Sequence, residues 1–568
     1  MAKLSPKIIL LILALLSIFI YRSVSFIGKK SIGFDEIFYS AAGYAAWTRH
    51  NYSVCLENPL LAKLWVSLPL LFLKPALPGY LEVPENHPHS HFIFGARFFS
   101  ENSGQREKIL SLSRGMVLIV SVIFAGLVFV FSRQIFGLVP ALISFFLYTF
   151  SPNILAYSGF ATTDLIMSFL LFLFVAVSVK TFRKTGISWY IYTGIILGLA
   201  FLTKFSAFIL LPLMAVFIIL ARLKEDLKPP QRERIVEYTG IILLSAAIIV
   251  LLGYRVIHIG EYVKGLALIL PMVMSAQGLG AVYLAGKYFQ GGLWYYYPVV
   301  FLLKTPVPVI ILIISASVSL WKRRTLVKYA DLIYPLSAAL VIFLCITGSR
   351  YQTGMRFLLP VLPFLFLWIG EEAYSLWQKK GWARAAVILL GLWYIASSVG
   401  IHPHYLAYFN EFTGGPKNGY KFLADCNIDW GQDLKGLKKY LDKEGNPHIV
   451  LSYFGNDDPS YYGIKFQKMA FRSRIERQGE PIESFSKEKQ LLAVSATNIT
   501  GVYYPGQEKF FQWLKGLKPV KRIGYSILVY DITDSAEAYE EMGKLYESQN
   551  KPDEAERAFS RMKEIRNG

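Results

Sequence analysis

The amino-acid sequence predicts an α-helical polytopic membrane protein that ends in a small α/β domain. The 568 residues are 54% hydrophobic and 15% aromatic, whereas only 17% are charged, which is less charge than soluble proteins of this size carry. Apolar runs long enough to cross about 30 Å of hydrocarbon recur up to about residue 400. Beyond that point the apolar runs shorten to strand length. These observations predict a membrane domain up to about residue 400, followed by a C-terminal domain outside the hydrocarbon.

About eleven apolar runs meet the hydropathy criterion for membrane spans. The first follows Lys3 and Lys7 in the manner of a signal peptide, but no small-residue cleavage site comes after it, so we expect a retained span. The approximate bounds of the predicted spans are 8–27, 113–134, 137–157, 164–180, 188–203, 205–222, 238–258, 296–320, 331–347, 355–377 and 384–401.

The distribution of Lys and Arg orients these spans. Alternate loops are basic, as in KTFRKTG, ARLKEDLKPPQRER, WKRRTLVKY and QKKGWAR, and short basic loops stay in the cytoplasm. The pattern predicts a multi-pass protein of the cytoplasmic (inner) membrane with its N-terminus inside, and an odd span count places the C-terminal region outside. Because the net charge of +20 is scattered over such loops, it does not indicate nucleic-acid binding.

Two predicted extracytoplasmic regions are large. The first outer loop, 28–112, belongs to a membrane domain over 1–401 and contains NPLLAKLWVSLPLLFL, which is short for a span and predicts an interfacial or re-entrant helix. In the tail, HIVLSYFG, KQLLAVSA and GYSILVYDI are typical of strands, and DLKGLKKYL and FFQWLKGL of helices. This alternation predicts an extracytoplasmic α/β domain over 402–534.

The last segment, 535–568, predicts a helical hairpin. Small and aromatic residues follow the offsets of one tetratricopeptide unit, at Tyr539, Gly543, Tyr546, Ala555 and Phe559. A plain amphipathic hairpin has the same pattern, so both interpretations stand. Because one such unit cannot bury its own apolar face, we expect the hairpin to pack on the preceding domain or on a protein partner.

Ionisable residues gather at the predicted outer ends of the spans. Such residues are costly there unless they line a polar cavity, although a single Lys or Arg can instead extend its charge to the interface. They are Asp35, Glu36, Glu57, Lys63, Arg114, Asp164, Lys204, Lys304, Arg350 and Arg356. A cavity with both charges suits sugar transfer from a polyprenyl phosphate, because a carboxylate can take the acceptor proton and cations can stabilise the leaving phosphate.

Six segments in order along the chain resemble one enzyme family: FDE, LENPLLAKL, SRGMVLIVSVIFAGLVFV, SPNILAYSGFATTD, GLAFLTKFSAFILLPL and GMRFLLPVLPFLFL. It comprises the dolichyl-phosphate-mannose-type protein mannosyltransferases and bacterial relatives that add aminoarabinose to lipid A. The resemblance implies the GT-C fold and an inverting glycosyltransferase whose donor carries a mannose-like sugar or an aminopentose. The acceptor, a hydroxyl or phosphate of a protein, lipid or glycan, stays open, since no MIR-type β-trefoil loop of the eukaryotic members is evident.

The resemblance also implies roles for individual residues. Asp35 would be the general base, with Glu36 assisting it or binding the acceptor; the two roles could be exchanged, because adjacent carboxylates titrate together. The cations that would hold the donor phosphate are Lys63, Arg114, Lys204 and Arg356. Asp164 would orient a cation or a sugar hydroxyl, and Glu57 would contact the donor sugar or a metal.

The motif DCNIDWGQD follows the last predicted span, in a segment that resembles a bacterial subgroup of the family. Its acidic and aromatic residues suit sugar contact, through Trp430 together with the carboxylates of Asp425, Asp429 and Asp433. The alternative is structural, with Asp429 capping a helix that begins in GQDLKGL.

A divalent metal is one of two interpretations of NHPHSH. His87, His89 and His91 alternate, so an extended segment would place them on one face. Three imidazoles can bind zinc, but a short His tract in an outer loop is also compatible with simple solvation. The three cysteines lack zinc-site spacing. A Cys55–Cys426 bridge is possible, because both residues lie in predicted loops, but nothing else in the sequence supports it.

A transporter of an anionic or sugar substrate is the alternative function, with the outer charges along its path. Against it, the sequence shows no internal repeat and no paired broken helices in corresponding halves. A scaffold that recruits partners through the terminal hairpin would leave the membrane carboxylates unexplained. The expected partners are therefore membrane lipids, a lipid-linked sugar and its acceptor.

Overall fold

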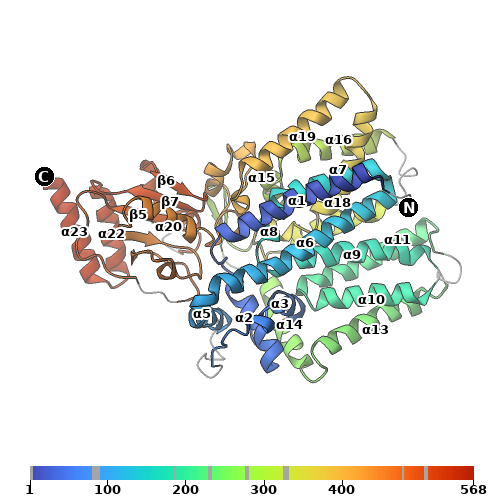
Figure 1. Ribbon diagram of the computed structural model, residues 1–568, viewed down its shortest axis with the longest axis horizontal. Coiled ribbons are helices and arrows are strands. Elements are labelled where there is room, and N and C mark those ends of the chain that lie inside the picture. Colours follow the sequence, from blue (N-terminus) through green and yellow to red (C-terminus); the bar gives the residue numbers. More distant parts are fainter. Residues whose placement is uncertain are drawn as a thin grey trace.

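The computed structural model describes residues 4–79, 90–184, 186–227, 233–274, 281–323, 332–475, 479–504 and 510–567. Figure 1 shows a bundle of long helices and, at one end of it, a smaller domain in which helices cover a sheet. The N-terminus lies at the far end of the bundle and the C-terminus at the far end of the smaller domain. The protein is thus mostly helical, as the sequence predicts.

Apolar helices form the bundle. Among the described residues, six helices are long and apolar enough to cross a membrane, or up to eight if each of two bent pairs is one span. The six are α1 (Pro6–Lys29), α6 (Arg106–Phe136), α9 (Thr163–Arg183), α11 (Leu210–Leu223) with the preceding turn η3 (Phe205–Ile209), α13 (Ile235–Gly253) and α19 (Trp382–Gly400).

The remaining predicted spans also fall on helices. Shorter apolar helices are α10 (Ile187–Phe201) and α17 (Ile333–Gly348). Two further helices are α14 (Ile259–Met274) and α18 (Leu362–Gln378). Of these, α14 was not among the predicted spans. The count of eleven crossings therefore stays a prediction, although every predicted run is helical over most of its length.

Two predicted spans are broken. α7 (Leu138–Phe150) and α8 (Pro152–Ser158) meet at 60°, and α15 (Tyr296–Lys304) and α16 (Val307–Arg323) meet at 115°. Proline pushes the residue before it out of the helical region, and Thr305, which precedes Pro306, is extended with φ −93° and ψ 132°. The prediction of one continuous helix over 296–320 is corrected accordingly.

Lys304 ends α15 at this break. Its Nζ donates to the carbonyl oxygens of Leu406, at 2.7 Å, and of Asn427. Its own carbonyl accepts a hydrogen bond of 2.8 Å from Nδ2 of Asn153. This buried cation therefore ties the bend to the segment that follows α19.

The first outer loop folds into α2 (Glu36–Arg49), α3 (Leu60–Ser67), α4 (Leu70–Leu73) and α5 (Ser90–Glu101). The predicted interfacial helix is thus two short helices, α3 and α4. Gly43 allows α2 to lie directly against α3, because a Cβ atom at this position would be 1.9 Å from the carbonyl oxygen of Lys63.

The C-terminal domain contains a five-stranded sheet in the order β4-β3-β5-β7-β6. The strands are β3 (Ile449–Ser452), β4 (Phe466–Lys468), β5 (Leu491–Ser495), β6 (Lys521–Ile523) and β7 (Ile527–Asp531). β3 is parallel to β4 and β5, whereas β7 is antiparallel to β5 and β6. The three predicted strands are confirmed as the three central ones.

Helices cover both faces of this sheet. On one face, α20 (Leu434–Lys443) packs its buried leucines against Ile449, Leu451 and Val529. On the other face lies the predicted hairpin, formed by α22 (Ala536–Ser548) and α23 (Pro552–Asn567). β3 and β5 are buried along their whole length, which explains why they are almost continuously apolar.

The hairpin packs on the domain, as expected for a unit that cannot bury its own face. The hydroxyl of Tyr546 accepts a hydrogen bond of 2.7 Å from Nε2 of Gln467, which lies on β4. Gly543 faces the ring of Phe559 on the second helix. The relationship of this hairpin to tetratricopeptide units stays a prediction.

Candidate active site

A cavity of about 380 Å³ lies where the first outer loop meets the bundle. We call it the charged cavity, because one part of its wall carries Asp35, Glu57, Lys204 and Arg356. Another part is apolar and comes from η3, α14 and α17, through Phe205, Ile209, Ile269, Val273 and Ile346. The sequence placed these four charged residues on the same side of the membrane, and the structure brings them together.

Salt bridges connect the charges of the cavity. Nη1 of Arg356 donates to Oδ2 of Asp35 at 2.8 Å, and its Nε lies 3.3 Å from Oδ2 of Asp164. Nζ of Lys204 donates to the other oxygen of Asp164 at 2.6 Å. Asp164 is 3% exposed. Asp164 itself does not line the cavity, but it pairs with both cations that do. The N–H groups of Lys204 and Arg356 that do not bind Asp164 or Asp35 can face the cavity.

Local structure places these side chains. Asp35 lies at the N-cap position of α2, and Asp164 lies in the first turn of α9, where a helix favours negative charge. Lys204 lies in extended backbone between α10 and η3. Arg356 follows Gly354, whose φ of +87° and close contact with Asn427 leave no room for a Cβ atom.

Burial changes the protonation of Glu57. Removal from water and the nearby charge of Asp35 raise the pKa of this carboxyl group, while Arg474 opposes the change. Glu57 therefore stays protonated to a higher pH than an ordinary glutamate does. In that form it can donate a hydrogen bond to a sugar or acceptor oxygen.

Glu36, by contrast, is a structural residue. It is 1% exposed and accepts two hydrogen bonds from Arg114, of 2.9 and 2.6 Å. The backbone N–H groups of Gly33 and Ala161 each donate to it at 2.7 Å. Its carboxylate is thus fully engaged within the protein, and we do not assign it to acceptor binding or to proton transfer.

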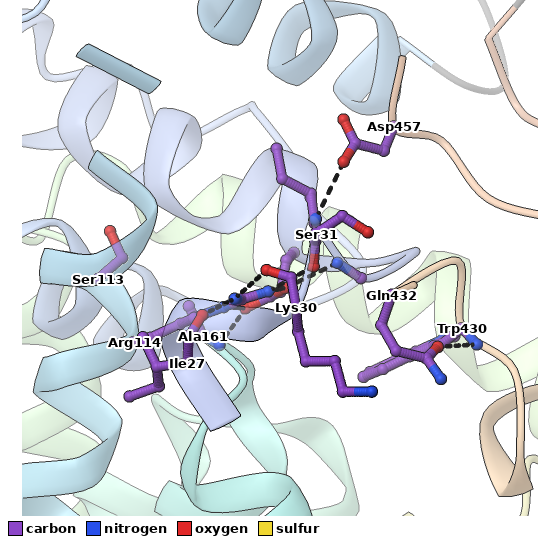
Figure 2. Close-up of polar contacts among 12 residues, drawn as sticks. Ile27, Lys30, Ser31, Ser113, Arg114, Ala161, Trp430, Gln432 and Asp457 are labelled. Atoms are coloured by element: carbon purple, nitrogen blue, oxygen red, sulfur yellow. Dashed lines mark hydrogen bonds and ion pairs between the residues drawn. The ribbon is translucent and has the colours of Figure 1, made fainter. Parts of the chain in front are cut away.

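Arg114 does not face the charged cavity either. Besides its two bonds to Glu36, it donates to the carbonyl oxygens of Ile27, Lys30 and Ser31 (Figure 2). These five bonds use all five N–H groups of the guanidinium. The sequence-based role of Arg114 in phosphate binding is therefore replaced by one in holding the chain between α1 and α2.

Lys63 lies outside the cavity as well. It is 2% exposed, and its Nζ donates to the carbonyl oxygens of Val54, at 3.1 Å, and Cys55, at 2.9 Å. This cation fixes the turn that leads to Glu57. Of the four predicted phosphate-binding cations, the structure thus leaves Lys204 and Arg356 at the cavity.

The DCNIDWGQD motif packs against the residues that line the charged cavity. Trp430 is 2% exposed and lies under Arg356, whose guanidinium carbon is 4.9 Å from the ring centre, a distance typical of cation–π contact. Phe160 packs edge-on against the same indole ring. Trp430 therefore positions a cation, in place of the predicted contact with sugar.

The carboxylates of this motif also bind within the protein. Asp429 accepts from the backbone N–H groups of Gly431 and Thr497, and burial raises the pKa of Asp429 to about 8. It does not cap α20, whose N-cap position is Asp433. Asp425 accepts a short hydrogen bond from the hydroxyl of Tyr503.

Tyr39, Tyr297 and Tyr351 also line the cavity and were missed from the sequence. Tyr39 lies four residues after Asp35, and residues at this spacing share one face of a helix. The spacing could therefore have predicted that Tyr39 lies beside Asp35. The hydroxyl of Tyr297 donates to the carbonyl oxygen of Tyr351 at 2.8 Å. With 35 tyrosines in the chain, residue type alone could not single these out.

The histidine prediction lies mostly outside the described residues, which do not include His87 and His89. His91 is buried on α5, where its ring packs against Phe38 and Phe92. Within the described ranges, no three His, Cys, Asp or Glu side chains are grouped to hold a metal, and Cys55 and Cys426 are free thiols. A divalent metal stays a prediction.

Residues 113–251 match the family described as dolichyl-phosphate-mannose-protein mannosyltransferase. This range includes Asp164 and Lys204, and three of the six segments that carry the resemblance. The resemblance to this family of membrane glycosyltransferases is therefore confirmed. No curated protein sequence matches the chain.

Among solved structures, the chain is similar to ArnT from Cupriavidus metallidurans bound to undecaprenyl phosphate, with 12% identity, 93% of this chain and 98% of that chain covered, and a TM-score of 0.48. It is also similar to archaeal oligosaccharyltransferase AglB from Archaeoglobus fulgidus in complex with an inhibitory peptide and a dolichol-phosphate, with 13% identity, 83% and 62% covered, and a TM-score of 0.41. At such TM-scores, the function has to be argued from the residues of this chain.

Proposed function

We propose that this protein is an inverting membrane glycosyltransferase that moves a sugar from a polyprenyl-phosphate donor to an acceptor outside the cytoplasm. The observation that carries the proposal is the charged cavity, where the carboxylate of Asp35 lies beside Lys204 and Arg356. The family match over 113–251 supports the same reaction class.

In the proposed reaction, Asp35 accepts the proton of the acceptor hydroxyl. The acceptor oxygen attacks the anomeric carbon of the sugar, and the bond from this carbon to the phosphate oxygen breaks on the opposite side. The polyprenyl phosphate leaves with the bonding electrons. Lys204 and Arg356 stabilise its negative charge, and Asp164 holds both cations in place beforehand, as preorganised electrostatic stabilisation requires.

The rest of the cavity wall fits the other parts of the substrates. The apolar residues of η3, α14 and α17 offer a surface for the first units of a prenyl chain. Glu57, protonated to a higher pH than usual, would bind a hydroxyl of the sugar or the acceptor. We keep a mannose-like sugar and an aminopentose as candidate donors, and a protein, lipid or glycan as candidate acceptors.

The orientation predicted from the basic loops completes the proposal. In this orientation, the charged cavity and the C-terminal domain lie on the extracytoplasmic side of the inner membrane. The donor would be a lipid-linked sugar that has been moved across the membrane to this side. A protein partner could bind the α22–α23 hairpin on the same side.

Replacing Asp35 tests this proposal directly. The purified protein in lipid nanodiscs should transfer sugar from at least one polyprenyl-phosphate donor in a panel, and Asp35→Asn should lower kcat at least about 100-fold, the effect of removing a general base. Asp442→Asn, at an exposed salt bridge on α20, is the matched control and should keep full activity.

Two results would contradict the proposal. Unchanged turnover in Asp35→Asn would remove the base assignment. Absence of transfer from every donor, combined with substrate uptake by vesicles that contain the protein, would favour a transporter instead.

A further inference from the structure

The backbone leading into Asp35 is held by residues far away in the sequence. The N–H of Ser31 donates to the carbonyl oxygen of Gln432 at 2.9 Å, and the N–H of Phe34 donates to that of Trp430 at 2.8 Å. Figure 2 shows this meeting of the first outer loop with the motif that follows α19. The two strand-like bonds fix the chain on one side.

The loop after β3 holds the same segment on another side. Oδ2 of Asp457 accepts from the N–H of Ile32 at 3.0 Å, and Nδ2 of Asn456 donates to the carbonyl oxygen of Phe34 at 3.0 Å. Both bonds connect residues that are more than 400 positions apart. The C-terminal domain therefore contacts the peptide unit directly before Asp35.

Asn456 is itself held in one orientation. It is completely buried, and its Oδ1 accepts from the hydroxyl of Ser473 at 3.0 Å and from the N–H of Arg474 at 2.7 Å. These two donors require an oxygen on that side, so the amide nitrogen must face Phe34. The ring of Phe34 also stacks on Phe454, with ring centres 4.9 Å apart.

We propose that Asn456 is a positioning residue for the reaction, because it fixes the peptide plane from which the side chain of Asp35 extends. The inference rests on the proposed function of Asp35 as the base. A rotation of this plane would displace the carboxylate, and a displacement of about 1 Å at a reacting group can cost about 100-fold in rate. The C-terminal domain would thus be part of the catalytic apparatus.

Asn456→Asp tests this inference in the full-length protein. The variant keeps the size and the accepting oxygen but loses the donor to Phe34. The matched control is Asn498→Asp, because Asn498 is a buried amide of the same domain that donates to Ser452 and Ala470. Both variants add one buried carboxyl group, so a general loss of domain stability should affect them alike.

We expect Asn456→Asp to lower kcat about 10- to 100-fold and to change the donor KM by less than about twofold, since Lys204 and Arg356 stay in place. Asn498→Asp should retain its kcat. Equal loss of kcat in the two variants, or unchanged kcat in Asn456→Asp, would overturn the inference.

Hydrogen exchange separates this inference from the proposed function. The amides of 31–36 should exchange faster in Asn456→Asp than in Asn498→Asp, whether or not a donor has been identified. If the wild type transfers no sugar while exchange over 31–36 differs between the two variants, the proposed function fails, but the role of Asn456 in holding the segment before Asp35 stands. If exchange over 31–36 is the same in both variants, the positioning role fails even when transfer is observed.

Discussion

At the scale of single residues, the meeting of several charged residues in one cavity was predictable, but the orientation of individual side chains was not. Asp35 and Glu36 are neighbours in the sequence, yet adjacent residues at the start of a helix point in different directions. One carboxylate therefore lines the charged cavity, whereas the other is buried against Arg114. A sequence shows which charges could meet, and only the packing of α1, α2 and α6 decides which pairs form.

The raised pKa of Glu57 gives a prediction at this scale. Because burial and Asp35 disfavour its ionised form, ionisation costs stability above the raised pKa, and the cost disappears below the usual value of 4.5. Glu57→Gln should therefore raise the melting temperature at about pH 8 and leave it unchanged at about pH 4.

Melting curves in detergent at the two pH values would check this. The exposed Glu483→Gln is the control and should shift neither curve. A stabilisation by Glu57→Gln that is equal at both pH values would show that the carboxyl group is not the cause.

At the scale of elements, buried strands were easier to predict than edge strands and bends. β3, β5 and β7 are apolar runs in the centre of the sheet, whereas β4 and β6 have three residues each and read FQK and KRI. The bend at Pro306 was hidden for a related reason. The flanking run VVFLLKTPVPVIILII is apolar apart from Lys304 and Thr305, so its mean hydropathy stays high across the proline at which the helix ends.

Packing inside the C-terminal hairpin gives a prediction at this scale. A Cβ atom on Gly543 would lie 2.5 Å from the ring of Phe559, so Gly543→Val should force the two helices apart at a cost of about 1–3 kcal/mol. Exchange of the amides in α22 and α23 should then become faster.

Gly391→Val is the matched control, since Gly391 lies inside α19 with nothing within 4 Å of its Cβ position. It should leave hairpin exchange unchanged. Equal exchange in the wild type and Gly543→Val would mean that Phe559 can move aside without loosening the hairpin.

At the scale of the whole molecule, three salt bridges between described residues join the membrane part to the C-terminal domain. One of them, between Arg106 of α6 and Asp457, is buried. Lys30 and Asp433 are 2.5 Å apart and almost fully buried. Lys435 and Glu107 are equally close, but Glu107 is 47% exposed. The same contact between domains thus contains buried and exposed ion pairs, so the contribution of Lys30–Asp433 can be compared with that of Lys435–Glu107.

We expect Lys30→Met to destabilise the protein by about 3–5 kcal/mol, because it leaves the carboxylate of Asp433 buried without its cation. Glu107→Gln removes the exposed pair and should cost less than about 1 kcal/mol. Melting temperatures of both variants, with limited proteolysis between α19 and α20, would measure the difference. Equal effects would show that burial does not decide the strength of this contact.

The bonds that hold residues 31–34 also determine when a newly made chain can become active. Ser31 is synthesised 401 positions before its partner Gln432, and the loop that contains Asp457 follows later still. The first spans can therefore insert while four backbone groups of the segment before Asp35 still lack their partners: the N–H groups of Ser31, Ile32 and Phe34 and the carbonyl oxygen of Phe34. If Asp35 is the base as proposed, chains that stop before the C-terminal domain would hold its carboxylate less firmly, so full activity would require the C-terminal domain to have been made and folded.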